Sequence, residues 1–290
     1  MSSNNIKEKN AVLGGVLYLV ATPIGNLADI SERALKVLSE VDFVAAEDTR
    51  NTGLMLSRFG ISKPMISYFE HNKSERGGQI VARLKSGESC AIVTDAGTPA
   101  ISDPGEDIVR LCASEGITVT SIPGCCAAIT ALTLSGMDTR RFVFEGFLST
   151  NKGERRERLG ELSDERRTMI FYEAPHKLRT TLSDLEKAFG GERQIALCRE
   201  LTKLNEEVCR TTVEDAIKIY SEREPRGEYV LIVAGANKKA EAEYPADPSE
   251  HVDMLVQSGM SKKDAIKAVA KARGVAKNDI YSLVMKKDEE

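Results

Sequence analysis

A glycine- and proline-rich segment, residues 95–105 (DAGTPAISDPG), is the part of the chain best suited to hold a ligand. It follows a short apolar run (residues 90–94, CAIVT) and precedes a helical pattern (residues 106–115), as in a strand that opens through a loop into a helix. Gly97 and Gly105 allow the backbone to approach a ligand closely. The segment has neither of the two common phosphate-loop spacings, G-x-G-x-x-G and G-x-x-x-x-G-K-[ST]. It therefore predicts a crevice whose ligand is not held mainly through a pyrophosphate.

The first 138 residues alternate strand-like and helical runs, and this alternation positions the loop. Short apolar runs typical of strands occur at residues 16–21, 43–46, 65–68, 90–94 and 118–122. The helical periodicity between them predicts a mostly parallel sheet covered by helices. Asp29 is expected to cap the helix after the first strand, with Glu32 at the reciprocal position of a capping box. The loop at residues 22–28 is thereby held between strand and helix.

Around residues 138–141 the pattern restarts and predicts a second α/β unit. Strands are expected at residues 142–146, 168–172, 194–199, 208–211 and 229–234, and helices near 154–162, 176–189 and 213–221. A polar linker at residues 235–249 precedes three helical patterns at 250–257, 261–271 and 277–284, broken at Gly274 as in a helix-turn-helix. The sequence thus predicts an α/β fold with domains at residues 14–138 and 139–236, and a small helical tail at 249–290.

Composition indicates a globular protein, because 290 residues that are 41% hydrophobic and 29% charged can bury a sizeable core. There is no apolar run long enough to span a bilayer and no signal-peptide core near the N-terminus, so a cytoplasmic location is expected and no membrane association. The six cysteines form no C-x-x-C pair, which predicts buried free thiols. Three widely spaced histidines and the lack of a metal-site motif predict no metal.

Charge is unevenly distributed along the chain, whose formal net charge is -4. Residues 261–287 contain eight Lys or Arg and two acids, a local charge of +6. Lys263, Lys267 and Lys271 recur at helical spacing on one face, which suits either contact with nucleic-acid phosphates or a solvated surface. A second basic cluster at residues 152–167 is interleaved with five acids, which favours a solvated helix face over contact with RNA.

Six blocks in order carry a resemblance to a known family. They are LYLVATPIGNLADISERA (17–34), AAEDTR (45–50), the loop at 95–105, SIPGCCAAITALTLSG (121–136), FYEAPHKL (171–178) and RELTK (199–203). Together they resemble the tetrapyrrole-methylase superfamily, over roughly residues 14–236. Within it, the chain is most similar to the branch that uses S-adenosylmethionine to methylate the 2'-hydroxyl of a cytidine ribose in 16S ribosomal RNA.

The resemblance implies that S-adenosylmethionine binds in a cleft between the two α/β domains without a metal, that the partner is 16S RNA within the small ribosomal subunit, and that the chain forms a homodimer. Matched segment by segment, the implied cofactor contacts are Pro23, Gly97, Thr98, Ala100, Cys125, Cys126, Tyr172, Leu201 and Val230.

A ribose 2'-hydroxyl is a weak acid, so a nearby base would assist its methylation. The candidates at the ends of predicted strands are Glu47, Asp48, His71, Glu173 and Glu200, although an acid there is often only a helix cap or an ion-pair partner. Arg50 and Lys203 could hold phosphates beside the target nucleotide, or simply pair with acidic neighbours. Phe69 and Asn205 stand where histidines are common in the family, so a mechanism that depends on those histidines is not expected here.

Two alternative functions remain open from the sequence. The shared architecture allows methylation of a small tetrapyrrole, although those relatives usually have a glycine-rich first loop where this chain has TPIGNLAD, with a single glycine. The chain could also be an inactive ribosome-associated binding module. Methyl transfer to RNA would separate the first function from both alternatives.

Overall fold

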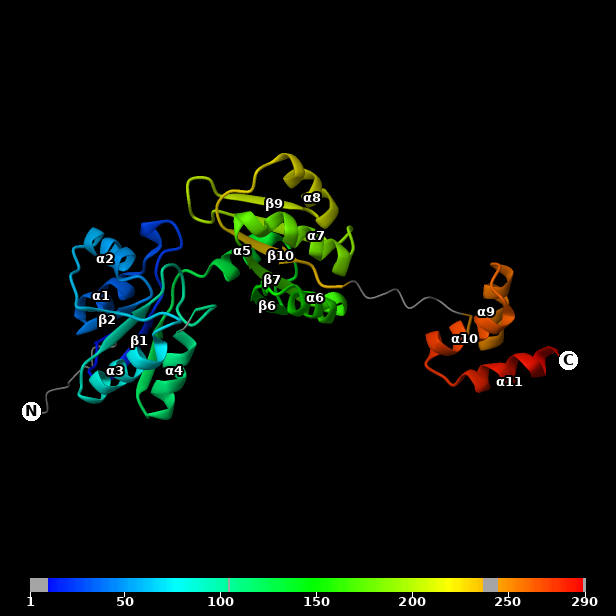
Figure 1. Cartoon of the computed structure of the whole chain (residues 1–290), viewed down its shortest axis with the longest axis horizontal. Coiled ribbons are helices and arrows are strands. Elements are labelled where there is room, and N and C mark those ends of the chain that lie inside the picture. The colour runs from blue at the N-terminus through cyan, green and yellow to red at the C-terminus, as the bar shows by residue number, and fades with distance from the viewer. Residues whose placement is uncertain (1–9, 104, 237–244, 289–290) are drawn as a thin grey trace, which may run out of the picture. The chain divides into compact units, whose positions relative to one another are not determined.

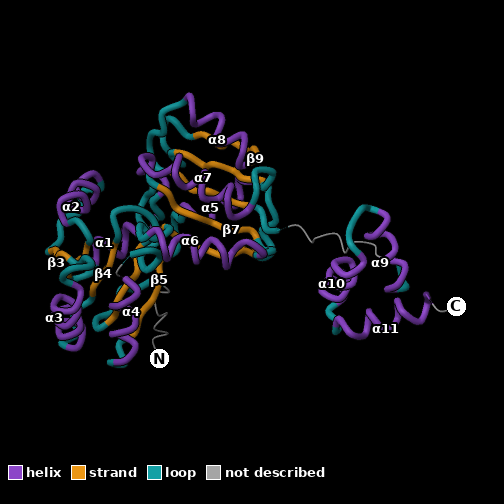
Figure 2. Tube along the Cα trace, turned by 45° about the vertical axis from the view of Figure 1, so that its right-hand side comes forward, coloured by secondary structure: helices purple, strands orange, loops and turns teal. Residues whose placement is uncertain are grey.

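The computed structural model describes residues 10–103, 105–236 and 245–288 and divides the chain into two compact units, Met1–Ala236 and Asn237–Glu290 (Figure 1). We call them the main unit and the C-terminal unit. The main unit contains two five-stranded sheets with helices packed against them, and the regular elements described for the C-terminal unit, within residues 245–288, are helices (Figure 2). The predicted α/β class with a small helical tail is confirmed.

The first sheet of the main unit is parallel, with strand order β3-β2-β4-β1-β5. Its strands are β1 (Val16–Val20), β2 (Phe43–Ala46), β3 (Met65–Ser67), β4 (Cys90–Val93) and β5 (Thr118–Ile122). β2 and β4 are buried throughout, as strands covered on both faces should be. One face packs against α1 (Glu32–Glu40) and α2 (Thr49–Arg58), and the other against α3 (Lys73–Lys85) and α4 (Gly105–Ser114).

The strand order creates a crevice at the carboxyl end of this sheet. β1 and β4 are neighbours, yet the helix after β1 packs on one face and the helix after β4 on the other. Their connecting loops therefore diverge, as they do where ligands bind in open α/β sheets. A backbone bridge between Thr22 and Gly97 holds the two loops together where they leave the strands, with N–O distances of 2.9 and 3.0 Å.

The predicted cap at Asp29 is wrong. Ser31 caps α1, and its hydroxyl accepts a hydrogen bond from the Ala34 amide at 3.1 Å. Asp29 instead ends a short 3-10 helix, η1 (Leu27–Asp29), which Asn26 caps. The loop after β1 thus contains a short helical turn. The sequence did not predict it, because Asn26, Asp29 and Ser31 are all residue types that cap helices and pattern alone does not say which of them does so.

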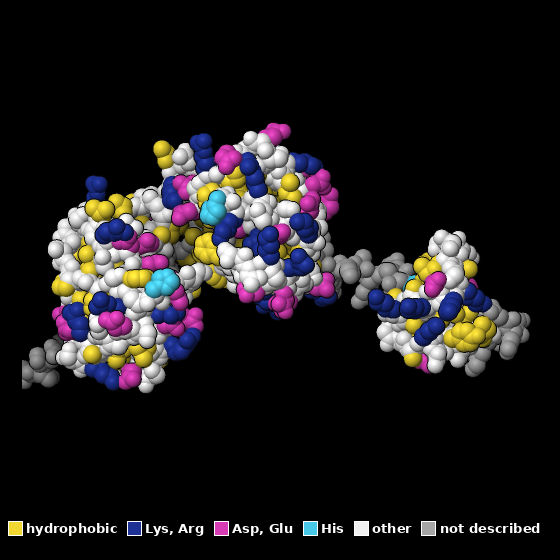
Figure 3. Space-filling view, in the orientation of Figure 1, with side chains coloured by type: hydrophobic (Ala, Val, Ile, Leu, Met, Phe, Trp, Pro, Cys, Tyr) yellow, Lys and Arg dark blue, Asp and Glu magenta, His cyan; other side chains and the backbone are white. Residues whose placement is uncertain are grey.

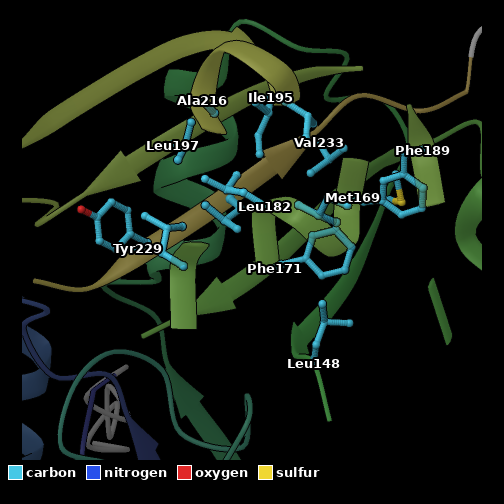
Figure 4. Close-up of a cluster of buried hydrophobic side chains, with 14 of the residues drawn as sticks. Leu148, Met169, Phe171, Leu182, Phe189, Ile195, Leu197, Ala216, Tyr229 and Val233 are labelled. Atoms are coloured by element: carbon cyan, nitrogen blue, oxygen red, sulfur yellow. The ribbon is translucent and has the colours of Figure 1, made fainter. Parts of the chain in front are cut away.

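The second sheet has strand order β6-β7-β10-β8-β9, with β6 parallel to β7 and the other pairs antiparallel. Its strands are β6 (Phe142–Phe147), β7 (Thr168–Glu173), β8 (Gln194–Arg199), β9 (Glu207–Thr212) and β10 (Tyr229–Val233). One face packs against α6 (Lys152–Glu161), α7 (Leu178–Phe189) and α8 (Val213–Glu222), and two further 3-10 helices are η2 (Leu162–Asp164) and η3 (Pro175–Lys177). Figure 4 shows the core on that face, with Phe171 from β7 and Leu182 from α7 among its side chains.

Helix α5 (Ala127–Ser135) covers the opposite face of the second sheet, although it precedes residue 138 in the sequence (Figure 1). Ala128, Ala131 and Leu132 pack with Ile170 of β7 and Val230 of β10. Its sequence, AAITALTLS, is apolar on most sides, and such a helix is stable only when it is buried. The chain therefore crosses from the first sheet to the second before α5, and so before residue 138. The predicted limits of the two α/β domains stay a prediction.

In the described part of the C-terminal unit, helices α9 (Pro248–Gln257), α10 (Lys262–Arg273) and α11 (Lys277–Asp288) pack around a core of their own. Val252, Ile266 and Ile280 bring one apolar side chain from each helix to that core. Ser261 caps α10, and Gly274 ends it with a left-handed φ of 67°. Across both units, none of the described helices is long and apolar enough to cross a membrane.

Candidate active site

A cavity of about 540 Å³ opens between the two sheets of the main unit. The loops after β1, β2 and β4 line it on one side, and β7, β8, β10 and the first turn of α5 line it on the other. A hollow between these two halves is visible in Figure 3, with hydrophobic side chains along it. Its volume lies within the range of roughly 300 to 1,000 Å³ found for small-ligand sites.

Gly97 is where the chain backbone forms the wall of the cavity. It is buried and has φ of 87°, a left-handed conformation that favours glycine. A Cβ atom added there would lie 3.3 Å from Cγ2 of Ile24, which also lines the cavity, and 3.6 Å from the carbonyl oxygen of Cys125. The backbone conformation and these two contacts therefore favour glycine at this position, while the close approach of backbone to ligand stays a prediction.

Asp103 holds the rest of this loop in shape. Its Oδ1 accepts hydrogen bonds from the amides of Ala100 at 2.9 Å and Gly105 at 2.7 Å. Thr98 ties the loop to the segment before α5, because its hydroxyl donates to the carbonyl oxygen of Cys125 at 2.8 Å. The Asp103 carboxylate thus organises the loop rather than facing a reaction partner.

Apolar side chains form the opposite wall, with an aromatic cluster at one end. Tyr172, Leu201 and Val230 belong to this wall. The Tyr172 ring packs edge-on against Phe144 and Phe147, with centroid distances of 5.2 and 5.4 Å. Burial raises the pKa of Tyr172 to about 12, so its hydroxyl stays protonated at neutral pH.

Among the described residues, the cavity is lined by one ammonium group, Lys203, and four carboxylates, Glu47, Asp103, Glu173 and Glu228. Lys203 Nζ lies 2.9 Å from a carboxylate oxygen of both Glu200 and Glu228. Burial is the largest influence on the Lys203 pKa and lowers it, but the hydrogen bonds to Glu228 and Glu200 outweigh burial and raise the pKa overall. Lys203 therefore keeps its positive charge, and the carboxylates of Glu200 and Glu228 balance it. Because carboxylates outnumber ammonium groups in the lining, the cavity favours a cationic ligand.

The structure brings two of the five predicted catalytic residues to the cavity, Glu47 and Glu173. Glu47 is exposed and accepts a hydrogen bond from the Thr94 hydroxyl at 3.1 Å. Glu173 is 4% exposed, and its carboxylate accepts hydrogen bonds from the Thr181 hydroxyl and from the Ala174 amide. Of the two, Glu47 is the carboxylate open to a substrate.

The other three predicted catalytic residues do not line the cavity. Asp48 caps α2, and hydrogen bonds from Arg50 lower its pKa to about 2. Glu200 binds Lys203, and that hydrogen bond lowers the Glu200 pKa. His71 is exposed and stacks edge-on with Phe69 at 6.1 Å.

Six of the predicted cofactor-binding residues line the cavity: Gly97, Thr98, Cys126, Tyr172, Leu201 and Val230. Pro23, Ala100 and Cys125 do not, although Ala100 and Cys125 hold the wall through the backbone bonds described above. The predicted RNA-binding residues are dispersed. Lys203 lines the cavity, Arg50 pairs with Asp48 at 2.8 Å, and Lys263, Lys267 and Lys271 are exposed on α10 of the C-terminal unit.

Several residues that line the cavity were not predicted from the sequence, and His176 and Phe147 are two of them. His176 lies in η3 and is exposed. The block FYEAPHKL contained it, but its position after Pro175 gave no sign that the short helix turns toward the cavity. Phe147 had a weak sequence signal, because Gly146 interrupts the alternation of the strand, as glycine does at a β-bulge.

The family model described as Tetrapyrrole (Corrin/Porphyrin) Methylases matches residues 16–217, and the chain belongs to this family. Solved structures of similar fold include a uroporphyrin-III-C-methyltransferase from Thermus thermophilus, with a TM-score of 0.55 and 20% identity over 76% of this chain and 94% of that chain. The cobalamin biosynthetic enzyme cobalt precorrin-4 methyltransferase matches with a TM-score of 0.56 and 16% identity, over 76% of this chain and 95% of that one.

Curated relatives are far more similar and match nearly the whole chain. The chain is 46% identical to the Ribosomal RNA small subunit methyltransferase I of Halalkalibacterium halodurans, over 93% of this chain and 94% of the relative. It is 44% identical to the protein of the same name from Synechocystis sp., over 93% of this chain and 97% of the relative. The family resemblance inferred from the six sequence blocks is therefore confirmed.

The residues of the cleft fit S-adenosylmethionine, the cofactor of this family of methyltransferases. Gly97 lines the cavity, and the tight contacts that a Cβ atom would make with Ile24 and Cys125 favour glycine in this wall. The apolar wall suits the uncharged parts of the molecule, and the excess of carboxylates suits its sulfonium cation.

Proposed function

We propose that this protein transfers the methyl group of S-adenosylmethionine to the 2'-hydroxyl of a cytidine ribose in the 16S RNA of the small ribosomal subunit. The observation that carries the proposal is identity above 40% along nearly the whole chain to relatives named Ribosomal RNA small subunit methyltransferase I. A cytoplasmic location follows from this substrate, and a homodimer from the family resemblance.

Positioning is the main contribution of the protein to the reaction. When bound, S-adenosylmethionine supplies a methyl group already activated by its sulfonium. The loop at Gly97 and the wall at Val230 then fix one reactant and keep water from it, while the open side of the cleft admits the RNA. Holding two reactants in line can supply roughly 7 to 11 kcal/mol of the barrier reduction.

Glu47 is the proposed proton acceptor. The ribose oxygen forms its bond to the methyl carbon as the carbon–sulfur bond breaks, and the hydroxyl proton passes to the Glu47 carboxylate. The other three carboxylates of the cavity already accept hydrogen bonds within the protein. Asp103 accepts from backbone amides, Glu173 accepts from the Thr181 hydroxyl, and Glu228 accepts from the Lys203 ammonium. Glu47 accepts one hydrogen bond, from Thr94, among the contacts of the described residues, and is exposed to an incoming substrate.

The direct test is to incubate purified small subunits with the protein and labelled S-adenosylmethionine and then map the modified nucleotide. We expect one labelled cytidine ribose in 16S RNA and equal activity with and without a chelator. A tetrapyrrole acceptor offered in parallel should remain unlabelled. Labelling of the tetrapyrrole and not of the RNA would overturn the proposal.

The role of Glu47 is tested separately with Glu47→Gln, which keeps the side-chain size and removes the base. We expect kcat to fall by about 100-fold or more, since general-base catalysis typically contributes at least that factor. Donor affinity should stay within about twofold. Asp103→Ala is the contrasting variant, and it should weaken donor binding instead, because it removes the oxygen that accepts the Ala100 and Gly105 amides and organises the loop. Normal kcat in the Glu47 variant would exclude it as the base.

A further inference from the structure

Phe147 is an exposed aromatic residue at the cavity, which is unusual for a ring of its size. The residue is 60% exposed, and it lies on β6, at the edge of the second sheet. Its contact with the neighbouring Tyr172 ring is edge-on, at a centroid distance of 5.4 Å. Phe147 therefore carries a large apolar surface that the described residues of the chain leave uncovered.

A β-bulge determines which side of the sheet Phe147 faces. Before the bulge, Phe144 pairs with Ile170, on the face covered by α5. The register then shifts, so that Gly146 pairs with Phe171 and Phe147 with Tyr172. Strict alternation would turn residue 147 to the other face, but the extra residue restores Phe147 to the same face as Phe144 and Tyr172.

Gly146 is suited to this bulge and brings the strand close to the cofactor loop. Its φ is 60°, in the left-handed region typical of glycine at such bulges. A Cβ atom there would lie 3.1 Å from the Ser102 hydroxyl, and Ser102 also lines the cavity. The residue that turns Phe147 toward the cavity therefore also lies beside the loop of Gly97 and Asp103.

We propose that Phe147 is the surface on which the base of the target nucleotide stacks. The inference rests on the proposed function, because a ribose whose 2'-hydroxyl reaches Glu47 has its base on the adjacent carbon, within reach of the cavity rim. Proteins that take single nucleotides out of RNA commonly stack the base on an exposed aromatic ring. The edge-on packing of Tyr172 supports one side of Phe147, while its exposed area is available to the base.

The absence of tryptophan from the sequence allows a direct test. In Phe147→Trp the new indole is the sole tryptophan of this chain. We expect its fluorescence, after subtraction of the signal from wild-type protein with the same small subunits, to be quenched at saturating donor. Phe142→Trp is the matched control, since Phe142 lies on the same strand at 38% exposure but does not line the cavity. Its fluorescence should not change. Equal quenching in both variants would overturn the proposal. Quenching that depends only on the concentration of the protein, without small subunits, would also overturn it, because that result would indicate self-association through Phe147.

Kinetics give a second readout. Phe147→Ala should raise the KM for small subunits about tenfold, in line with the loss of one stacked base, and leave donor affinity within about twofold. Phe147→Tyr should restore the KM, because it keeps the ring, and Phe142→Ala should leave it unchanged. An unchanged KM in Phe147→Ala, with the wild-type protein active on small subunits, would overturn this inference alone. Failure of the wild-type protein to methylate small subunits would instead overturn the proposed function.

Discussion

At the residue scale, the acids that follow strands of the main unit differ by the partners that surround them. Asp48 and Glu200 have lowered pKa values because Arg50 and Lys203 donate hydrogen bonds to them. Glu173 is buried against Thr181, whereas Glu47 remains exposed at the cavity. Residues of the same type and similar position in the sequence therefore have different chemical capacities, and only Glu47 among these four is open to a substrate.

Gly97 leads to a prediction at this scale. Gly97→Ala should lower donor affinity at least tenfold, because the methyl group enters the wall beside Ile24. The left-handed φ should also lower the free energy of unfolding by about 1–2 kcal/mol. Gly60→Ala is the control, since Gly60 has φ of 68° with nothing within 4 Å of an added Cβ. Gly60→Ala should lower the free energy of unfolding by a similar amount and leave donor affinity unchanged. Calorimetry that gives wild-type affinity for Gly97→Ala would place the donor elsewhere.

At the element scale, a buried polar network joins α6, α7 and β7 beneath the cavity. Arg155 of α6 bonds Asp184 and Thr181 of α7 at 2.7 Å each, and Thr181 in turn donates to Glu173 at the end of β7. The Arg155 side chain is only 11% exposed. The sequence interpretation of its cluster as a solvated helix face is therefore wrong at this residue, because Arg155 reaches inward between the helices.

This network predicts unequal effects of neighbouring arginines. Arg155→Met should lower the free energy of unfolding by about 1.5–3 kcal/mol, the usual size for hydrogen bonds to charged groups, and loosen the support of Glu173. Arg156→Met is the matched control, because Arg156 is exposed on the next position of the same helix. Chemical denaturation of both variants checks the difference. Equal stability of the two would show that the network contributes little.

His251 predicts a pH dependence for the packing of the C-terminal helices. It is 2% exposed in α9, and burial, followed by the nearby Arg273, lowers its pKa from 6.5. The unfolded helices then bind the proton more readily than the folded ones, so stability is complete above about pH 6.5 and falls as the pH drops below it. Hydrogen exchange of α9, α10 and α11 should accelerate, after correction for intrinsic rates, between pH 7 and 5.5. His251→Gln should abolish that change, and its persistence in the variant would assign it to another group.

At the scale of the whole molecule, the cavity belongs to the main unit and the exposed lysines of α10 belong to the C-terminal unit. Every residue that lines the cavity lies between Ile24 and Val230, inside the main unit. The C-terminal unit has its own core and presents Lys263, Lys267 and Lys271 to solvent. We therefore expect donor binding and RNA binding to be separable by substitution.

Replacing Lys263, Lys267 and Lys271 together by Ala tests this separation. Small-subunit binding should weaken, and each lost phosphate contact should remove about 0.7 to 0.9 from the slope of log affinity against log salt. Donor affinity should be unchanged. A salt slope equal to that of the wild type would return these lysines to a solvated surface, and Lys203 and Arg50 would then be the remaining predicted contacts with the RNA backbone.

The sequence by itself determined the strands, the helices and the family of this protein. Buried strands such as Phe43–Ala46 and Cys90–Val93 are apolar runs, and residues 95–105 signal a loop through their glycines and prolines, so local pattern suffices to find them. Only the tertiary structure decided that α5 packs on the second sheet, that Arg155 is buried and that His176 and Phe147 reach the cavity. These outcomes depend on contacts between segments far apart in the chain and on one extra residue in a strand, which local sequence pattern does not specify.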